Sequence, residues 1–317
     1  MFLAVFSYIV DITTEKNRTY RLGLVSFCVY IGMPIGAALS GFLLKLFGYL
    51  TVYITSLIIF ILNFSYITLF LSDPERTKEH KEHDNRGFVY FMKTFFSPAH
   101  LLNSLKVLFR KTENNRAVLL CVLIASACFV FGPLYGESAI MYMSTRYRFG
   151  WDELQYSFFQ TYNMTLNIIG TMFSILVISK ALGWHDSVMG IFSTSSKILA
   201  SFVYCFAKTG TVFFLGPITD ILHGTSYIAL RSIISKSVEP DEIGRLISLV
   251  SLIEVLMPLV YVPLYTRVYT ATIGVMPGLV FLMGSSLTVP PLLLFTWLLY
   301  MHLKTQKLSK SDSVTSS

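Results

Sequence analysis

The sequence predicts an all-α protein that crosses a membrane several times, and three observations carry this prediction. The 317 residues are 54% hydrophobic and 14% charged, with a mean hydropathy of +0.61, whereas a soluble domain carries about a quarter charged residues. Apolar runs of roughly 20 residues, the length of a membrane-spanning helix, recur along the chain. Lys197 lies in the middle of one such run, and intramembrane charges usually face a bundle interior or an aqueous path.

The apolar runs place membrane helices in a regular order along the chain. Their approximate ranges are 22–45, 51–71, 118–142, 155–179, 187–207, 211–235, 246–270 and 275–302. Residues 1–10 are apolar but too few to span a bilayer, so we interpret them as the end of one more helix. The expected parts are an N-terminal remnant (1–71), a linker (72–117), a six-helix block (118–303) and a tail (304–317).

The linker and the tail are the polar parts of the chain. Residues 72–86 are densely charged, and Ser97-Pro98 then has the form of a helix N-terminus. The following AHLLNSLKVLFRK has apolar residues at helical spacing, which predicts an amphipathic helix on the membrane surface. The tail is serine-rich and predicted to be disordered.

Basic residues are distributed unevenly between the two sides of the predicted bundle. One side holds Lys16, Arg18, Arg21, all the Lys and Arg residues of the linker, Lys180, Lys236, Arg245, Lys304, Lys307 and Lys310; the other holds Lys45, Arg146, Arg148, Lys208 and Arg267. Because basic loops stay in the cytosol, the linker and the tail are predicted to be cytosolic. The net charge of +7 then reflects topology, and we expect no binding of nucleic acid.

Enzyme and metal chemistry are not indicated. The four cysteines lie in apolar segments without a CxxC pair, which is typical of small buried residues: Cys28, Cys121, Cys128 and Cys205. The chain has no HExxH pair, nucleophile elbow or phosphate loop. We therefore expect no catalytic residue, no metal and no cofactor.

The 211–235 helix carries the most informative group of polar residues. Asp220, His223, Tyr227 and Arg231 recur at spacings of three, four and four, which places them on one helical face. One interpretation is a substrate or proton pathway, in which Asp220 and His223 exchange protons and Arg231 holds a carboxylate. The alternative is that Asp220 and Arg231 lie near the helix ends and meet headgroups and water.

Three further charged residues lie within predicted helices: Glu137, Lys197 and Glu254. Glu137 follows Gly132, Pro133 and Gly136, which are expected to distort the helix and expose backbone to a ligand; alternatively it is a carboxylate of the outer vestibule.

Glu254 and Lys197 are candidates for structural charges. Glu254 lies about two turns inside its helix and is expected to pair with a cation or with a part of the protein outside this chain. Lys197 pairs within the bundle or extends toward the interface. In the first helix, GMPIGAALSG places Gly32, Pro34 and Gly41 within a few turns, a composition typical of close helix packing.

Several segments resemble the proton-coupled folate transporter family (solute carrier family 46) of the major facilitator superfamily. They are DITTEKNRTYR with GMPIGAALSGFLLKLFGY, FRKTENNRA, FGWDELQYSFFQTYN, and LRSIISKSVEPDEIGRLISLV. The resemblance implies a twelve-helix bundle of two halves, of which this chain supplies the end of helix four through helix twelve. Helices one to three would be absent, so we expect the chain by itself to show no saturable, proton-driven uptake.

The resemblance also implies roles for particular residues. Asp11 matches the family's acidic residue at the end of helix four, and Arg231 matches an arginine implicated in proton coupling and substrate binding. The helix-seven histidine associated with folate transport has no counterpart, because Phe129 and Phe131 lie in that neighbourhood.

The expected function is therefore proton-coupled uptake of a small organic anion, folate-like or peptide-like. The expected partners are that solute, protons and the lipid bilayer, with the oligomeric state left open. The alternatives are a membrane receptor or interaction protein without transport, and an inactive fragment. The expected location is the plasma membrane, with the lysosomal membrane as the alternative.

Overall fold

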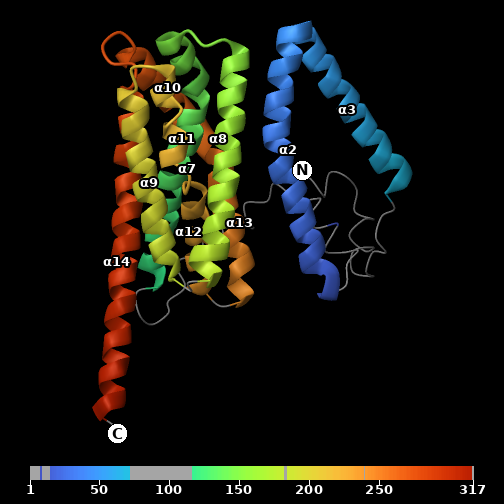
Figure 1. Cartoon of the computed structure of the whole chain (residues 1–317). Helices are drawn as coiled ribbons and strands as arrows, with labels where there is room; N and C mark the ends of the chain where they lie inside the picture. Colours follow the sequence, from blue (N-terminus) through green and yellow to red (C-terminus); the bar gives the residue numbers. More distant parts are fainter. Residues whose placement is uncertain (1–7, 9–14, 72–115, 182–183, 239, 316–317) are drawn as a thin grey trace, which may run out of the picture. The chain divides into compact units, whose positions relative to one another are not determined.

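The computed structural model describes residues 8, 15–71, 116–181, 184–238 and 240–315 (Figure 1). Those residues are helical apart from short turns, and no strand occurs among them. Seven of the described helices are long and apolar enough to cross a membrane. The predicted all-α membrane fold is thus confirmed. Asp11, most of the predicted helix end at 1–10 and the linker helix near 98–111 lie outside the described residues.

The chain divides into two compact units, which we describe separately. Unit 1 comprises residues 1–98 and 152–164, and unit 2 comprises residues 99–151 and 165–317. The helices of unit 1 are α2 (Glu15–Phe47), α3 (Tyr49–Phe70) and the first part of α8 (Glu153–Phe173).

Unit 2 holds the remaining helices and the larger core. They are α7 (Arg116–Phe149), the rest of α8, a π-helical stretch η1 (Ser174–Ala181), α9 (Asp186–Phe206), α10 (Gly210–Phe213), α11 (Gly216–Thr219), α12 (Gly224–Lys236), α13 (Pro240–Thr272) and α14 (Leu279–Thr315). Helix α9 packs against α14 and α12, and α7 packs against α13 and α14. Buried apolar side chains such as Leu123, Phe131 and Phe295 fill the space between them.

In unit 1, a glycine turn joins two helices that bury little. Gly48 adopts φ 82 between α2 and α3, a conformation that glycine reaches without steric cost. None of the α3 residues is buried, and its exposed apolar side chains are typical of a lipid-facing helix. Helix α2 continues through Pro34 without a break. Gly41 lies directly against the side chain of Ser157 on α8, where a Cβ atom would collide.

The predicted distortion of the helix around Glu137 is wrong. The helix runs unbroken from Arg116 to Phe149 through Pro133. A Cβ atom on Gly132 would collide with the ring of Tyr261, and one on Gly136 with the ring of Tyr265. These glycines therefore let α13 approach α7 closely, which explains their presence without a broken helix.

The predicted continuous helix at 211–235 is wrong, because the segment is broken into α10, α11, a turn at 220–223 and α12. Gly216 and Pro217 begin α11, and Gly224 begins α12. The sequence favours interruption at these positions, since glycine and proline weaken a helix interior. Gly170 of α8 lies against the carbonyl of Ile221 in the turn, where any side chain would collide.

The C-terminal helix also differs from expectation. Helix α14 continues to Thr315, so residues 304–315 are helical where a disordered tail was predicted. The segment is polar, but the preceding helix provides an existing turn, and extending a helix costs far less than nucleating one. The other predicted membrane helices appear with ends shifted by a few residues.

Candidate functional site

Unit 2 encloses a cluster of three charged side chains from three helical elements. The Nζ of Lys197 on α9 donates to Oε2 of Glu137 on α7 at 2.6 Å. It also donates to Oδ2 of Asp220, at the end of α11, at 3.5 Å. The three side chains are only 3–7% exposed. Lys197 therefore lies in the interior and does not extend toward the interface, and Glu137 is not a vestibule carboxylate.

Serine side chains of α9 hold the broken segment in place beside Lys197. Ser196 Oγ donates to the carbonyl of Thr219. Ser193 Oγ donates to the carbonyl of His223 at 2.9 Å and accepts from the backbone N–H of Ser226 at 2.9 Å. Backbone groups freed by a helix break in a membrane need such partners. These bonds place Asp220 directly opposite Lys197.

Further groups of other helices face the two carboxylates. Oε1 of Glu137 accepts no hydrogen bond and lies against Gly284 of α14. Tyr265 of α13 is fully buried, and its hydroxyl lies near the same glycine without a hydrogen bond. Oδ1 of Asp220 also accepts none, and the His223 Nδ1 atom lies 3.8 Å from it.

A second charged group, centred on Arg231 of α12, is more open. Its Nη2 donates to Oε2 of Glu254 at 3.1 Å and to Oγ of Ser251 at 3.2 Å, both on α13. The guanidinium lies over the ring of Tyr227, 4.4 Å from the centroid, and that ring meets Phe131 edge to face at 5.2 Å. The Arg231 and Glu254 side chains are 32% and 28% exposed, so both are partly open to solvent.

The predicted polar stripe is thus divided between two clusters. Asp220 and His223 belong to the group around Lys197, whereas Tyr227 and Arg231 belong to the group around Glu254. The helix break after Thr219 separates them. Four further residues of the two clusters were not predicted from the sequence: Ser193, Ser196, Ser251 and Tyr265. The run of hydroxyl residues in FSTSSK, directly before Lys197, is the signal that could have indicated the first two.

The two ends of unit 2 carry separate polar contacts. At one end, Arg148 donates to the carbonyls of Tyr204, Cys205 and Ala207 at 2.6–3.1 Å, which caps the end of α9. At the other end, Lys236 contacts Asp186 at 2.6 Å. There His185 stacks on His302 with centroids 4.1 Å apart; burial, and next the neighbouring His302, lower the pKa of His185.

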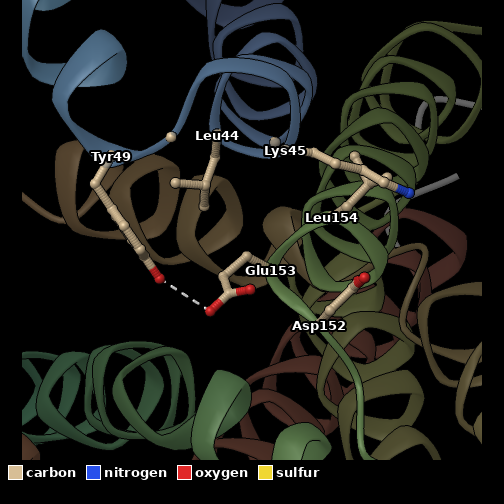
Figure 2. A pocket seen from close by; sticks show the side chains of 8 residues that line it. Leu44, Lys45, Tyr49, Asp152, Glu153 and Leu154 are labelled. Atoms are coloured by element: carbon tan, nitrogen blue, oxygen red, sulfur yellow. Dashed lines mark hydrogen bonds between the residues drawn. The ribbon is translucent and has the colours of Figure 1, made fainter.

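A pocket in unit 1 lies at the α2–α3 turn and the start of α8 (Figure 2). The hydroxyl of Tyr49 donates to Oε1 of Glu153 at 3.0 Å across it, with Lys45 and Asp152 at its side. None of the sequence-predicted site residues lines this pocket. Within the described part of the chain, no group of three or more His, Cys, Asp or Glu side chains could hold a metal ion.

Comparison with known proteins gives a family match. The family described as Major Facilitator Superfamily matches residues 1–262. The lysosomal proton-coupled steroid conjugate and bile acid symporter SLC46A3 of Mus musculus is 27% identical over 91% of this chain. The probable peptidoglycan muropeptide transporter SLC46 of Drosophila melanogaster is 22% identical over 87% of it. The proton-coupled folate transporter of Rattus norvegicus is 23% identical over 92%.

The matches cover only part of the length of these relatives. The chain spans 61% of the mouse protein, 53% of the fly protein and 60% of the rat protein. All three are members of solute carrier family 46 or its folate transporter branch, the family that the sequence motifs indicated. The resemblance proposed from those motifs is therefore confirmed.

Proposed function

The chain belongs to the Major Facilitator Superfamily, and we propose that it acts as a multi-pass membrane transporter that moves a small organic anion together with protons. The observation that carries this proposal is the Arg231–Glu254 pair at 3.1 Å, since both side chains are partly exposed. A guanidinium held by a single carboxylate oxygen keeps donors for a second anion. Arg231 is accordingly the anion-binding residue of the proposal.

The pair suggests how binding of the solute is exchanged for an internal contact. Without solute, Glu254 and Ser251 hold the guanidinium. An incoming carboxylate or sulfate takes the place of Glu254, and bidentate geometry makes the new contact stronger than the present one-oxygen contact. The rings of Tyr227 and Phe131 offer an apolar wall beside the charge.

The substrate class follows from this site and from the names of the relatives. Those names refer to steroid conjugates, bile acids, muropeptides and folate, and a cation beside aromatic rings suits an anion that also carries a large body. Asp220, His223 and Glu137 are proposed for the proton pathway. Asp11, proposed for the same pathway, lies outside the described residues.

Uptake into proteoliposomes under an imposed inward proton gradient tests the proposal. The solutes are a bile acid, a steroid sulfate, a muropeptide and a folate, each with and without a protonophore. The protein is the 317-residue chain, compared with a chimera that adds the portion of the mouse relative outside the match. Saturable, protonophore-sensitive uptake by either protein supports the proposal, and uptake by the chimera alone also supports the expectation that this chain is inactive by itself. Its absence from both contradicts the transport proposal.

The membrane that holds the protein is a further part of the proposal. The plasma membrane is the default, and the name of the mouse relative favours the lysosomal membrane. A fluorescent fusion imaged with a lysosomal marker and a plasma-membrane marker decides between the two.

A further inference from the structure

The buried cluster around Lys197 has one more negative than positive charge when all three groups are ionised. Lys197 provides one positive charge, and Glu137 and Asp220 provide two negative charges. The three side chains are 3–7% exposed, and an uncompensated buried charge is costly. In a membrane protein such a charge is neutralised or placed on a functional path. When the cluster binds one further proton, its net charge becomes zero.

The surroundings offer no fixed compensation for the excess charge. Among the described residues, Lys197 and His223 are the cationic groups within ion-pair distance of either carboxylate. The imidazole is 3.8 Å from Asp220, which is beyond a hydrogen bond. From α13 the cluster is faced by the neutral hydroxyl of Tyr265, and from α14 by the backbone at Gly284. A titrating proton is the remaining way to reach neutrality.

Two carboxylate oxygens are free to take that proton. Oε1 of Glu137 and Oδ1 of Asp220 are buried and accept no hydrogen bond from the residues that the structure describes, while the other oxygen of each carboxylate contacts Lys197. Because both carboxylates lie against one ammonium group, the charge on one disfavours the charge on the other. The arrangement can therefore hold one proton with either carboxylate as its site.

We propose that the Glu137–Asp220 pair, bridged by Lys197, is a binding site for one exchangeable proton, separate from the anion site at Arg231. The role of this proton in transport rests on the proposed function, whereas its binding does not. The proton comes from water on the side of solute entry and forms an O–H bond with one carboxylate. It leaves to water on the opposite side, and Lys197 keeps its own protons throughout. Lys197 is a positioning residue that holds both carboxylates.

The Arg231 group is independent of this site in its contacts. It contains one guanidinium and one carboxylate, so it is neutral without a proton. None of its contacts includes Glu137, Lys197 or Asp220. Protons and solute thus bind at separate places on the two sides of the helix break between α11 and α12.

Infrared difference spectroscopy of the 317-residue chain in lipid nanodiscs tests proton binding directly. A buried protonated carboxyl group gives a carboxylic-acid C=O band that disappears as the pH rises and shifts in D2O. We expect one such band in the unchanged chain. Glu137→Gln and Asp220→Asn should each remove it, because each leaves Lys197 with one carboxylate and no excess charge. Glu254→Gln should keep it.

The outcomes are distinct. No titrating band in the unchanged chain overturns the inference, since the carboxylates are then permanently ionised. A band that persists in both Glu137→Gln and Asp220→Asn overturns it as well, because the proton is then elsewhere. A proton held by the imidazole of His223 would leave both carboxylates ionised and give no such band, which also overturns the inference, so His223→Gln should retain the band. Lys197→Arg retains the positive charge and should keep the band. If Lys197→Met folds, the pH at which half of the band is lost should be higher than in the unchanged chain.

The transport assay separates this inference from the proposed function. In the protein that shows uptake, Glu137→Gln and Asp220→Asn should remove the dependence of uptake on the proton gradient. Absence of uptake in every variant contradicts the proposed function while the infrared band still reports the proton site. Gradient-driven uptake that survives both substitutions contradicts the proton site alone.

Discussion

The two charged clusters of unit 2 use the same chemistry in opposite environments. Lys197 is 6% exposed and bridges two carboxylates, whereas Arg231 is 32% exposed and contacts one. Each cluster joins two helices through an ion pair: Lys197 of α9 lies 2.6 Å from Glu137 of α7, and Arg231 of α12 lies 3.1 Å from Glu254 of α13. Burial, and not the identity of the pair, therefore decides whether a charge is fixed in place or accessible from outside the bundle.

The environments also separate two requirements of coupled transport. In the proposed mechanism, a proton needs only an oxygen atom with an unbalanced charge, which the sealed cluster of Glu137, Lys197 and Asp220 provides. In the proposed mechanism, an organic anion needs an accessible cation, which the open cluster of Arg231 and Glu254 provides beside the ring of Tyr227. Four predictions test this contrast.

The largest expected effect is on stability, and it concerns the two cations. Lys197→Met leaves two buried carboxylates without their cation and should lower the free energy of unfolding by about 3–5 kcal/mol. Arg231→Met removes a partly exposed pair and should cost about 1 kcal/mol or less. Thermal and denaturant unfolding of the purified protein in detergent measures both. Equal losses would mean that burial does not distinguish the clusters.

The second prediction concerns uptake and compares two arginines. Arg231→Ala should reduce uptake about 10- to 100-fold, the factor that corresponds to losing one charge-assisted hydrogen bond to the solute. Arg267→Ala is the matched control, because Arg267 is exposed near the end of α13, and it should change uptake less than about twofold. Initial rates with the solute that is taken up are the measurement. Similar reductions would rule out Arg231 as the anion site.

The third prediction concerns the packing of the sealed cluster. A Cβ atom at Gly284 would collide with Oε1 of Glu137, so Gly284→Ala should destabilise the protein by about 1–3 kcal/mol. The same substitution at Gly274, where no atom lies within 4 Å, should stay within about 0.5 kcal/mol. Unfolding curves of the two variants provide the comparison, and a neutral Gly284→Ala would show that the cluster is loosely packed.

The smallest expected effect concerns Glu254, which competes with the solute in the proposed mechanism. Glu254→Gln keeps the size of the side chain but removes its charge, so Arg231 is freed and the KM for the anion should fall about threefold. Glu137→Gln should leave the KM unchanged within error, because Glu137 does not contact Arg231. A KM that rises in Glu254→Gln would indicate that Glu254 itself helps to hold the solute.

The fold class and the family could be predicted from the residues alone. Long apolar runs permit only helices in a bilayer, because the backbone must satisfy its hydrogen bonds within each segment; seven of the predicted spans appear as continuous helices or as a helix with its π-helical extension. The spacing of Asp220, His223, Tyr227 and Arg231 singled out the polar residues of both clusters. Lys197, in the middle of an apolar run, indicated where the sealed cluster lies.

Only the tertiary structure decided how these residues are paired. Helical spacing placed Asp220 and Arg231 on one face, but the helix break separates them. The break is stable because Ser193 and Ser196 of α9 bond its freed backbone, and contacts between helices distant in sequence cannot be read from periodicity. Glu137 and Lys197 are 60 residues apart. They meet where α7 and α9 both pack against α14, whose Gly284 leaves room for Oε1 of Glu137. Burial, which sets the chemistry of each charge, arises only from that packing.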